Sequence, residues 1–181
     1  MKIFAETKRL ILREILPSDL EDMFELDSDP MVHQYLGNKT IVDKNKIAEI
    51  INHVRQQYTD HGIGRWAIIE KDTNGFIGWS GLKFVTELTN GHQFYYDLGY
   101  RLKRKSWGHG FATESASASL DYAFHVLKTD DVYAAANCKN SASINVLQKV
   151  RMKFSGTFYY EDILCNWYKI EKSDYRAIHN K

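Results

Sequence analysis

Hydrophobic residues recur along this chain with two distinct periods. Between residues 43 and 59 they lie three and four positions apart, which is the spacing of one helix face. The residues on that face are Ile47, Ile50, Ile51, Val54 and Tyr58. Elsewhere, short runs rich in β-branched and aromatic residues are typical of strands. They predict seven strands, at residues 8–15, 65–71, 76–85, 92–102, 131–137, 153–164 and 166–175.

Turn and cap residues mark the borders of these elements. The sequence DTNG at 72–75 separates two strand patterns and predicts a hairpin turn. Pro17 introduces a helix in which Ser18 and Glu21 have the spacing of a capping box. The residues of this helix that we expect to face inward are Leu20, Met23 and Phe24.

Two further helices are predicted, one from about Phe111 and a short one at 141–150. The residues on the apolar face of the longer helix are Ala112, Ala116, Leu120, Ala123, Phe124 and Leu127. The predicted order is therefore β-α-α-β-β-β-α-β-α-β-β, without a linker, a repeat or a low-complexity block. Hairpins mixed with helices favour a single α/β domain over residues 1–181, with a mixed sheet covered on both faces.

Composition narrows the class of protein. The chain has 24 Lys and Arg residues against 23 Asp and Glu residues, so its formal net charge is +1. This balance gives no reason to expect binding to nucleic acid or to an anionic membrane. Cys138 and Cys165 stand alone, which favours reduced thiols. No segment approaches about 18 uninterrupted apolar residues, and the N-terminus lacks a signal-peptide pattern, so we expect a cytoplasmic protein.

The sequence KRKSWGHGFATE at 103–114 follows a predicted strand and opens a predicted helix. Gly108 and Gly110 lack Cβ atoms, so a ligand can approach the backbone closely. The helix N-terminus offers unpaired N–H groups to a phosphate, and the three preceding basic residues add mobile positive charge. A strand-to-helix turn that needs glycine for its own geometry explains the same residues. This segment alone leaves both interpretations open.

A dinucleotide-binding site of the Rossmann type is disfavoured. Such a site needs a third glycine in the loop, and Thr113 stands in its place. The strands that precede the loop also have the pattern of an antiparallel meander. A phosphate bound here would therefore belong to another kind of ligand.

A second strand-to-helix junction follows at 137–154, with the sequence NCKNSASINVLQKVRMKF. Asn140 is a good N-cap residue for the short helix. Asn140 and Ser143 have a role beyond the helix itself only if a ligand lies between the two junctions. The apolar residues expected to pack on the core are Ile144, Leu147 and Val150.

Three segments together resemble the GNAT superfamily of N-acetyltransferases. They are DLGY at 97–100, WGHGFATE at 107–114 and NSAS at 140–143. The resemblance covers nearly the whole chain, including RLILR at 9–13, and is closest to the RimJ/RimL-type subgroup that acetylates ribosomal-protein N-termini. It implies the GNAT fold, with a mixed, mostly antiparallel twisted sheet of about seven strands and helices on both faces. It also implies acetyl-coenzyme A as donor and an amine as acceptor, and it leaves a homodimer open.

The resemblance places the coenzyme on the glycine loop and on the strand before it. The pyrophosphate loop of the family falls on residues 105–110, with Lys105 where Gln or Arg is usual. The backbone of residues 100–102 would pair with the pantetheine amides, and Asn140 would hydrogen-bond the pantetheine arm. The coenzyme-binding residues implied in this way are Tyr100, Arg101, Leu102, Lys105, Trp107, Gly108, His109, Gly110, Phe111, Ala112, Thr113 and Asn140.

The implied reaction is direct attack of a neutral amine on the thioester carbonyl. An N-terminal α-amine has a pKa near ~8 and a lysine amine has one near ~10.4. A lysine acceptor therefore depends on a general base more strongly than an α-amine does. Asp97, where family members often carry Glu, is the best general-base candidate and would act through a water. A cross-strand polar residue explains Asp97 equally well. Asp162, or its neighbour Glu161, is the rival carboxylate.

Two positions depart from the family pattern. Many members place a tyrosine beside the leaving thiolate, and Leu147 stands at that position. Ser143 remains as a hydrogen-bond donor to the sulfur, or it satisfies the first turn of its own helix. The family also has a left-handed glycine at the end of this helix, where this chain has Arg151. Either the helix ends differently or Arg151 adopts a strained conformation.

Three functions remain open from the sequence. They are acetylation of a protein N-terminus, acetylation of a small amine such as a polyamine, an aminoglycoside or an amino acid, and coenzyme A binding without turnover. Acceptor contacts are expected from residues 30–37, the second helix and the hairpin at 159–167. The seven histidines are scattered without the spacing of metal ligands, so we expect no metal.

Overall fold

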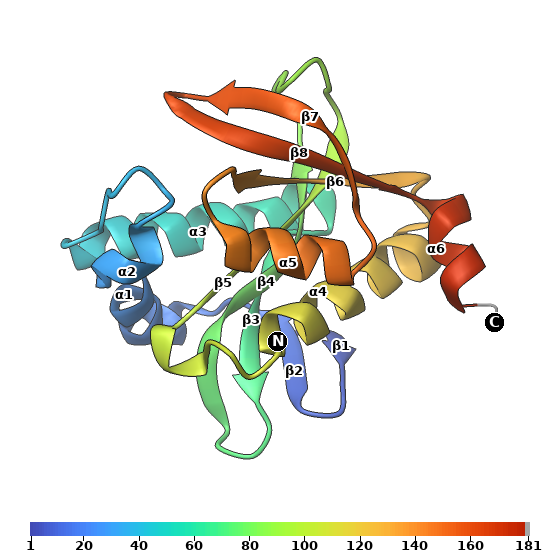
Figure 1. The fold of residues 1–181 in the computed structure, drawn as a ribbon. Helices are drawn as coiled ribbons and strands as arrows, with labels where there is room; N and C mark the ends of the chain where they lie inside the picture. Colours follow the sequence, from blue (N-terminus) through green and yellow to red (C-terminus); the bar gives the residue numbers. More distant parts are fainter. Residues whose placement is uncertain (180–181) are drawn as a thin grey trace.

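The computed structural model of the protein describes the backbone of residues 1–179 and the side chains of residues 1–175. Within this range, eight strands form one sheet in the order β1-β2-β3-β4-β5-β6-β8-β7 (Figure 1). The strands are β1 (Ile3–Glu6), β2 (Leu10–Glu14), β3 (Arg65–Glu70), β4 (Gly75–Val85), β5 (Tyr95–Leu102), β6 (Asp131–Asn137), β7 (Lys153–Tyr160) and β8 (Ile163–Glu171). The helices are α1 (Leu20–Ser28), α2 (Pro30–His33), α3 (Lys44–His61), α4 (Phe111–Tyr122), α5 (Ser141–Lys149) and α6 (Lys172–His179).

The predicted fold class is confirmed. All neighbouring strands in the described sheet are antiparallel except β5 and β6, which are parallel. The sheet has one strand more than predicted, because β1 was not expected. Its four residues, IFAE, are too few to show a period, and β1 is held by pairing with β2.

The C-terminal hairpin differs from the prediction. Its turn lies at Glu161 and Asp162, between β7 and β8, which is earlier than predicted. Glu161 adopts a positive φ of 49° in this turn. Glycine or asparagine usually marks such a position, and this sequence has neither there. After Glu171 the chain forms α6, where a strand was predicted to continue to residue 175.

The predicted capping box of Ser18 and Glu21 is wrong. The carboxylate of Asp19 accepts the Leu16 N–H at 2.8 Å and both Nη groups of Arg13 at 2.7 Å. A 3-10 turn over Pro17–Asp19 precedes α1, so the side chain that accepts a backbone N–H at the helix start is Asp19, two positions before the predicted Glu21. Asp19 is buried, and its ion pair joins β2 to the start of α1.

A short helix that the pattern did not predict, α2, follows α1 almost directly. Pro30 occupies its first position, and the Asp29 carboxylate accepts the Met31 N–H at 2.9 Å. Its last residue, His33, is buried although it is polar. The α2 segment therefore places an imidazole inside the protein, next to α1.

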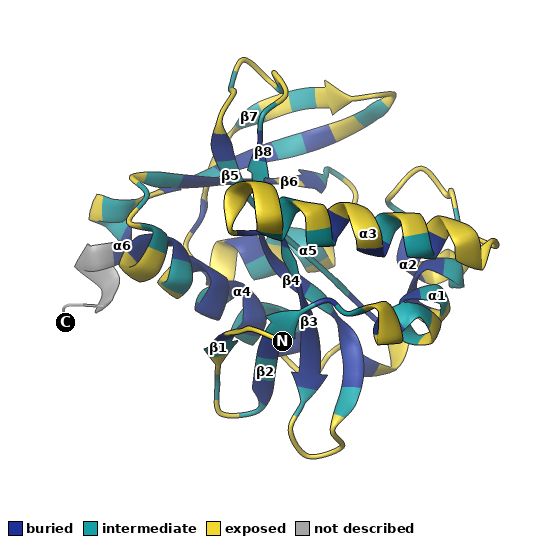
Figure 2. Cartoon of the chain, turned by 180° about the vertical axis from the view of Figure 1, so that it is seen from behind, coloured by how far each residue is buried: buried dark blue, intermediate teal, exposed yellow. Residues whose placement is uncertain are grey.

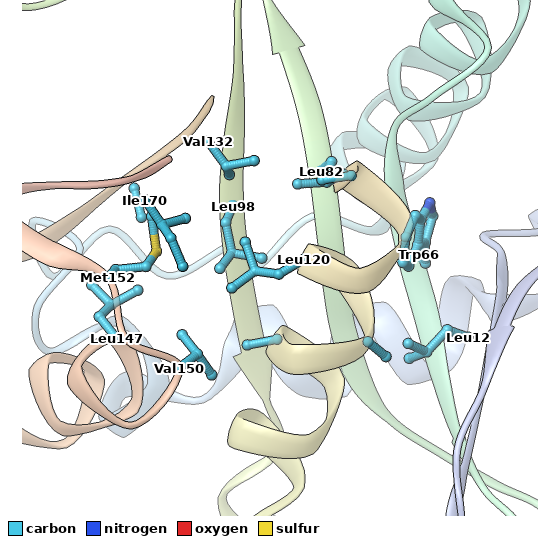
Figure 3. Packing of buried hydrophobic residues seen from close by; sticks show 14 of the residues in the cluster. Leu12, Trp66, Leu82, Leu98, Leu120, Val132, Leu147, Val150, Met152 and Ile170 are labelled. Carbon is cyan, nitrogen blue, oxygen red and sulfur yellow. The ribbon is translucent and has the colours of Figure 1, made fainter. Parts of the chain in front are cut away.

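Two apolar cores lie on opposite faces of the sheet, and many positions of the strands between them are buried (Figure 2). We call the face covered by α1, α2 and α3 the α3 face, and the face covered by α4 and α5 the α4 face. On the α4 face, Leu120 of α4 packs among Leu12, Trp66, Leu82 and Leu98 from four strands (Figure 3). The helix residues that were predicted to face the core and are buried are Met23, Ile47, Ile51, Val54, Ala116, Leu120, Ala123, Phe124, Leu147 and Val150.

Arg151 has the strained conformation that the missing glycine suggested. Its φ is +66°, and the Met152 N–H bonds the carbonyl of Leu147 at 3.0 Å to close the end of α5. A residue with a Cβ in this region costs about 1 kcal/mol relative to glycine. We therefore expect Arg151→Gly to raise the free energy of unfolding by about 1 kcal/mol in urea denaturation. Arg151→Ala keeps the Cβ and should give no such gain. Equal midpoints for the two variants would contradict this account.

Candidate active site

The sheet opens at the junction between β5 and β6. Only one residue pair, Asp97 with Tyr133, is in register between these two described strands. On its other side β5 stays paired with β4 as far as Leu102. The β6 side of β5 therefore has no ladder partner among the described strands from Leu98 onwards. Unpaired N–H and C=O groups at such an edge can bind an extended ligand as an added strand.

The glycine loop leads directly from this open edge into α4. Gly108 and Gly110 adopt positive φ values of 79° and 81°, and α4 begins at Phe111. No side chain caps the first turn of α4. The N–H groups of that turn are thus available to an anion, as they are at many helix N-termini. A Cβ on Gly108 would meet no described atom within 4 Å, so the loop faces open space there.

An ion pair from the β1–β2 hairpin holds the loop in shape. Arg9 Nε donates to Glu114 at 2.7 Å, and Arg9 Nη1 donates to the carbonyl of His109 at 2.9 Å. The same guanidinium stacks on the ring of Phe111, 4.5 Å from its centre. Burial alone would raise the pKa of Glu114, but hydrogen bonds from Thr7 and Arg9 outweigh it and lower this pKa. Arg9 was part of the resemblance, but its contact with the loop was not predicted.

The basic residues before the loop do not all provide mobile charge, as the sequence had suggested. Lys103 is buried, and its ammonium group pairs with Asp22 and Glu25 of α1. Lys105 is exposed and lies 3.5 Å from Glu25. Alternation along β5 explains the difference, because Lys103 continues the α3 face. Lys103 therefore anchors the end of β5 to α1, and Lys105 remains beside the loop.

The other loop residues predicted to bind the coenzyme lie around this anchor. Trp107 Nε1 donates to the carbonyl of Leu102 at 2.8 Å, which folds the loop back on the strand. Ala112 and Thr113 are partly exposed in the first turn of α4. The structure thus brings residues 102–113 together at one place.

The second junction lies across the opening from β5. Asn140 caps α5, because its Oδ1 accepts the Ser143 N–H at 3.1 Å. Tyr100 of β5 reaches this turn, with its hydroxyl 2.9 Å from the Ser143 carbonyl and 3.0 Å from Ser143 Oγ. Burial raises the pKa of Tyr100, so this phenol stays protonated. Leu147 is only 1% exposed and belongs to the core.

On the α3 face of β5, Asp97 forms an ion pair with Arg65 of β3. Arg65 Nη1 also donates to the backbone carbonyl of Asp97 at 2.6 Å. To reach Asp97, the guanidinium crosses over Gly99, where a Cβ would lie only 2.7 Å from Arg65 Nη2. The glycine of DLGY therefore makes room for this arginine. Sequence reasoning missed Arg65, because nothing local to residue 65 indicates a partner 32 positions away.

The two strand-to-helix junctions lie within the part of the chain that matches a known family. A profile of the acetyltransferase (GNAT) domain matches residues 9–153.

The chain belongs to the GNAT family of acetyltransferases.

One relative and two solved structures are similar to most of this chain. The Bacillus subtilis (strain 168) protein YkkB is 32% identical over 152 residues, which cover 83% of this chain and 86% of YkkB. The ribosomal-protein α-N-acetyltransferase RimL, solved with coenzyme A, is 16% identical with a TM-score of 0.79 and coverage of 96% and 99%. The Vibrio cholerae spermidine N-acetyltransferase, solved with coenzyme A and spermine, is 17% identical with a TM-score of 0.75 and coverage of 93% and 99%. These two structures share the fold and differ in their named acceptors.

The second carboxylate predicted for this GNAT enzyme, Asp162, is not on a strand. It lies in the exposed turn between β7 and β8, next to Glu161. Glu161 pairs with Lys39 at 3.3 Å, so the tip of the hairpin touches the segment after α2. The structure brings Tyr100 and Ser143 into contact beside β5, puts Asp97 on the α3 face of the same strand, and puts Asp162 at the hairpin tip.

The α3 face of the GNAT enzyme is uncovered over the middle of β6. Ala135 is exposed although its strand lies between β5 and β8. The neighbouring aromatic residues Tyr133 and Trp167 are buried against each other, with ring centres 5.5 Å apart. Among the described residues, no group of three His, Cys, Asp or Glu side chains could hold a metal ion, and no helix could cross a membrane.

Proposed function

We propose that this GNAT enzyme transfers an acetyl group from acetyl-coenzyme A to the α-amine of a polypeptide N-terminus. The observation that carries the choice of acceptor is the pairing of carboxylates on the α3 face. Asp97 is paired with Arg65, and Asp27 is paired with Arg101. A polyamine or an aminoglycoside carries several positive charges and needs unpaired carboxylates. An N-terminus carries a single positive charge and does not.

The opening beside β5 supports the donor half of the proposal. The first turn of α4 and the backbone at Gly108 and Gly110 would hold the pyrophosphate. The free edge of residues 98–102 would pair with the pantetheine amides. Lys105 would add a positive charge at the loop. The Asn140 oxygen already caps α5, so a contact with the pantetheine arm would come from its amide nitrogen.

The acceptor amine must be neutral to attack. An α-amine with a pKa near ~8 is partly neutral at pH 7.5, whereas a lysine amine, near ~10.4, is roughly three units from this state. Asp97 would receive the proton through a water, while the new C–N bond forms and the C–S bond of the thioester breaks. Its ion pair with Arg65 holds the Asp97 carboxylate in place on the α3 face.

Ser143 would stabilise the leaving thiolate with the help of Tyr100. The Tyr100 hydroxyl has one proton for two nearby acceptors on Ser143. When the Tyr100 hydroxyl donates to Ser143 Oγ, the Ser143 hydroxyl can donate its own hydrogen bond to the coenzyme sulfur. Ser143→Ala should then lower kcat without changing the KM of the acceptor, and an unchanged kcat would remove this contact from the mechanism.

An acceptor panel tests the proposed function. The enzyme is incubated with acetyl-coenzyme A and with short peptides, spermidine, an aminoglycoside or free amino acids, and release of the coenzyme thiol is measured. We expect a free peptide N-terminus to give the highest kcat/KM and the same peptide with a blocked N-terminus to give no release. A faster reaction with spermidine or the aminoglycoside would refute the choice of acceptor. Calorimetric binding of coenzyme A without thiol release on any amine would identify a binding module without turnover.

A further inference from the structure

Two arginines stack against one tryptophan on the α3 face. Trp79 of β4 lies directly opposite Arg101 of β5 in the strand register. The guanidinium carbons of Arg65 and Arg101 are 5.5 Å and 5.1 Å from the Trp79 ring centre. Each arginine has one carboxylate partner, Asp97 for Arg65 and Asp27 for Arg101. The indole and the two ion pairs form a rigid layer, because planar guanidinium groups stack well on aromatic rings.

The two arginines differ in the donors that they have left. Arg65 donates to the carbonyls of Gly81 and Asp97 and to the Asp97 carboxylate, and its side chain is 14% exposed. Arg101 donates through Nη1 to Asp27, and its side chain is 23% exposed. Among the described residues, Arg101 Nε and Nη2 have no acceptor within hydrogen-bonding distance. The Arg101 guanidinium is therefore held by Asp27 through Nη1, and its Nε and Nη2 groups can donate hydrogen bonds to a ligand.

The partner of Arg101 fixes it from the inside of the protein. The Asp27 side chain is 2% exposed, and its Oδ1 also lies 3.2 Å from Nε2 of the buried His33. A side chain that is buried and paired in this way cannot move out to meet a ligand. The exposed side of the guanidinium is preorganised in this way. A planar, fixed guanidinium with free N–H groups is the preferred partner of a carboxylate.

The position of Arg101 on β5 sets the distance between its guanidinium and the amine that would react beside Asp97. Arg101 and Asp97 are four residues apart on the same strand and point to the same face. At ~3.3 Å per residue their Cα atoms are about 13 Å apart. An extended peptide covers about 10 Å in three residues, and an acidic side chain supplies the rest. The distance thus fits an acidic residue near the third position of a polypeptide.

We infer that Arg101 binds a carboxylate of the acceptor, an acidic side chain a few residues after the N-terminal amine. This inference rests on the proposed function and names its substrate class. A free carboxylate on a small amine has the same chemistry, and the length of the acceptor distinguishes the two sources. A positively charged residue at the same position faces Arg101 and is disfavoured.

The test compares hexapeptides that differ only by Asp, Asn or Lys at one of positions two to five. The α-amine pKa is nearly constant within each set at positions three to five, so differences in kcat/KM report recognition. We expect Asp to exceed Asn by about tenfold at position three or four, and Lys to be poorer than Asn. A parallel pair, 6-aminohexanoate and 6-aminohexanamide, tests whether a short carboxylate suffices. Better use of 6-aminohexanoate than of every peptide would overturn the assignment to a polypeptide.

Variants locate the preference on Arg101. Arg101→Gln alone leaves the buried Asp27 with only His33 beside it, so the informative variant is the double change Asp27→Asn with Arg101→Gln. It should remove the Asp-over-Asn ratio. Lys46→Gln removes a positive charge from an exposed ion pair on α3 and should keep the ratio.

The outcomes separate this inference from the proposed function. Transfer to peptides with equal kcat/KM for Asp and Asn at every position would overturn the role of Arg101 alone. A ratio that persists in the double variant would overturn it as well. Binding of coenzyme A without transfer to any peptide would overturn the proposed function, and this inference with it.

Discussion

Replacing Gly108 by alanine is expected to raise the dissociation constant for coenzyme A about 100-fold. A Cβ at this position meets no described atom within 4 Å, so the free protein has no clash. The φ of +79° is unfavourable for alanine, and the loop backbone rotates to relieve it. Rotation turns N–H groups away from the pyrophosphate, and losing charge-assisted hydrogen bonds corresponds to about 2–3 kcal/mol of binding.

The chain offers a matched control for this variant. Gly62, at the end of α3, has a φ of +68° and also has no described atom within 4 Å of an added Cβ. Gly62→Ala and Gly108→Ala should both lower the free energy of unfolding by about 1 kcal/mol. Only Gly108→Ala should weaken coenzyme A binding in calorimetry. Equal coenzyme affinity in the two variants would show that the glycine loop does not hold the pyrophosphate.

Asp97→Asn is expected to slow acetyl transfer about 100-fold at pH 7 and much less at pH 9. An α-amine with a pKa near ~8 is mostly protonated at pH 7 and mostly neutral at pH 9. A base that removes its proton therefore matters most at the lower pH, and general bases contribute about 10²–10⁴-fold. The measurement is kcat/KM for a peptide acceptor across this pH range.

Asp97 also holds Arg65, so the variant needs a control for the lost ion pair. Asp27→Asn removes another paired carboxylate of the α3 face and leaves its arginine, Arg101, without a partner. Its effect should be the same at pH 7 and pH 9, because Asp27 is buried behind Arg101. If Asp97→Asn gives a constant ratio to the wild type at both pH values, its role is to position Arg65 and not to accept a proton.

Local patterns predicted most of the elements that position the site. The alternation around DTNG set β3 and β4, and the two strand-to-helix junctions were found because glycine, asparagine and serine mark helix starts. Elements with weak local marks were missed or misplaced. The four residues of β1 are too short for a period, and the turn at Glu161 lacks its usual residues.

Contacts between distant segments could not be predicted in the same way. Tyr100 of β5 contacts Ser143 of α5, and Asp97 of β5 contacts Arg65 of β3. These elements are far apart in the sequence and lie close together only in the folded protein. A single sequence contains no information about such pairs beyond the residue types themselves. Lys103 shows the resulting error, since a basic residue beside a glycine loop was assigned to mobile charge and is instead buried against α1.

The anchoring of Lys103 has a consequence for how the two substrates influence each other. Lys103 ties the end of β5 to α1, and α1 carries Asp27, the residue that fixes Arg101. The glycine loop and the α3 face are thereby linked through one helix, and we expect binding of the coenzyme and of the acceptor to influence each other. By thermodynamic reciprocity, an acceptor that shifts α1 changes the affinity for the coenzyme by the same factor that the coenzyme changes the affinity for the acceptor. Coenzyme A titrations with and without a saturating peptide measure this factor directly.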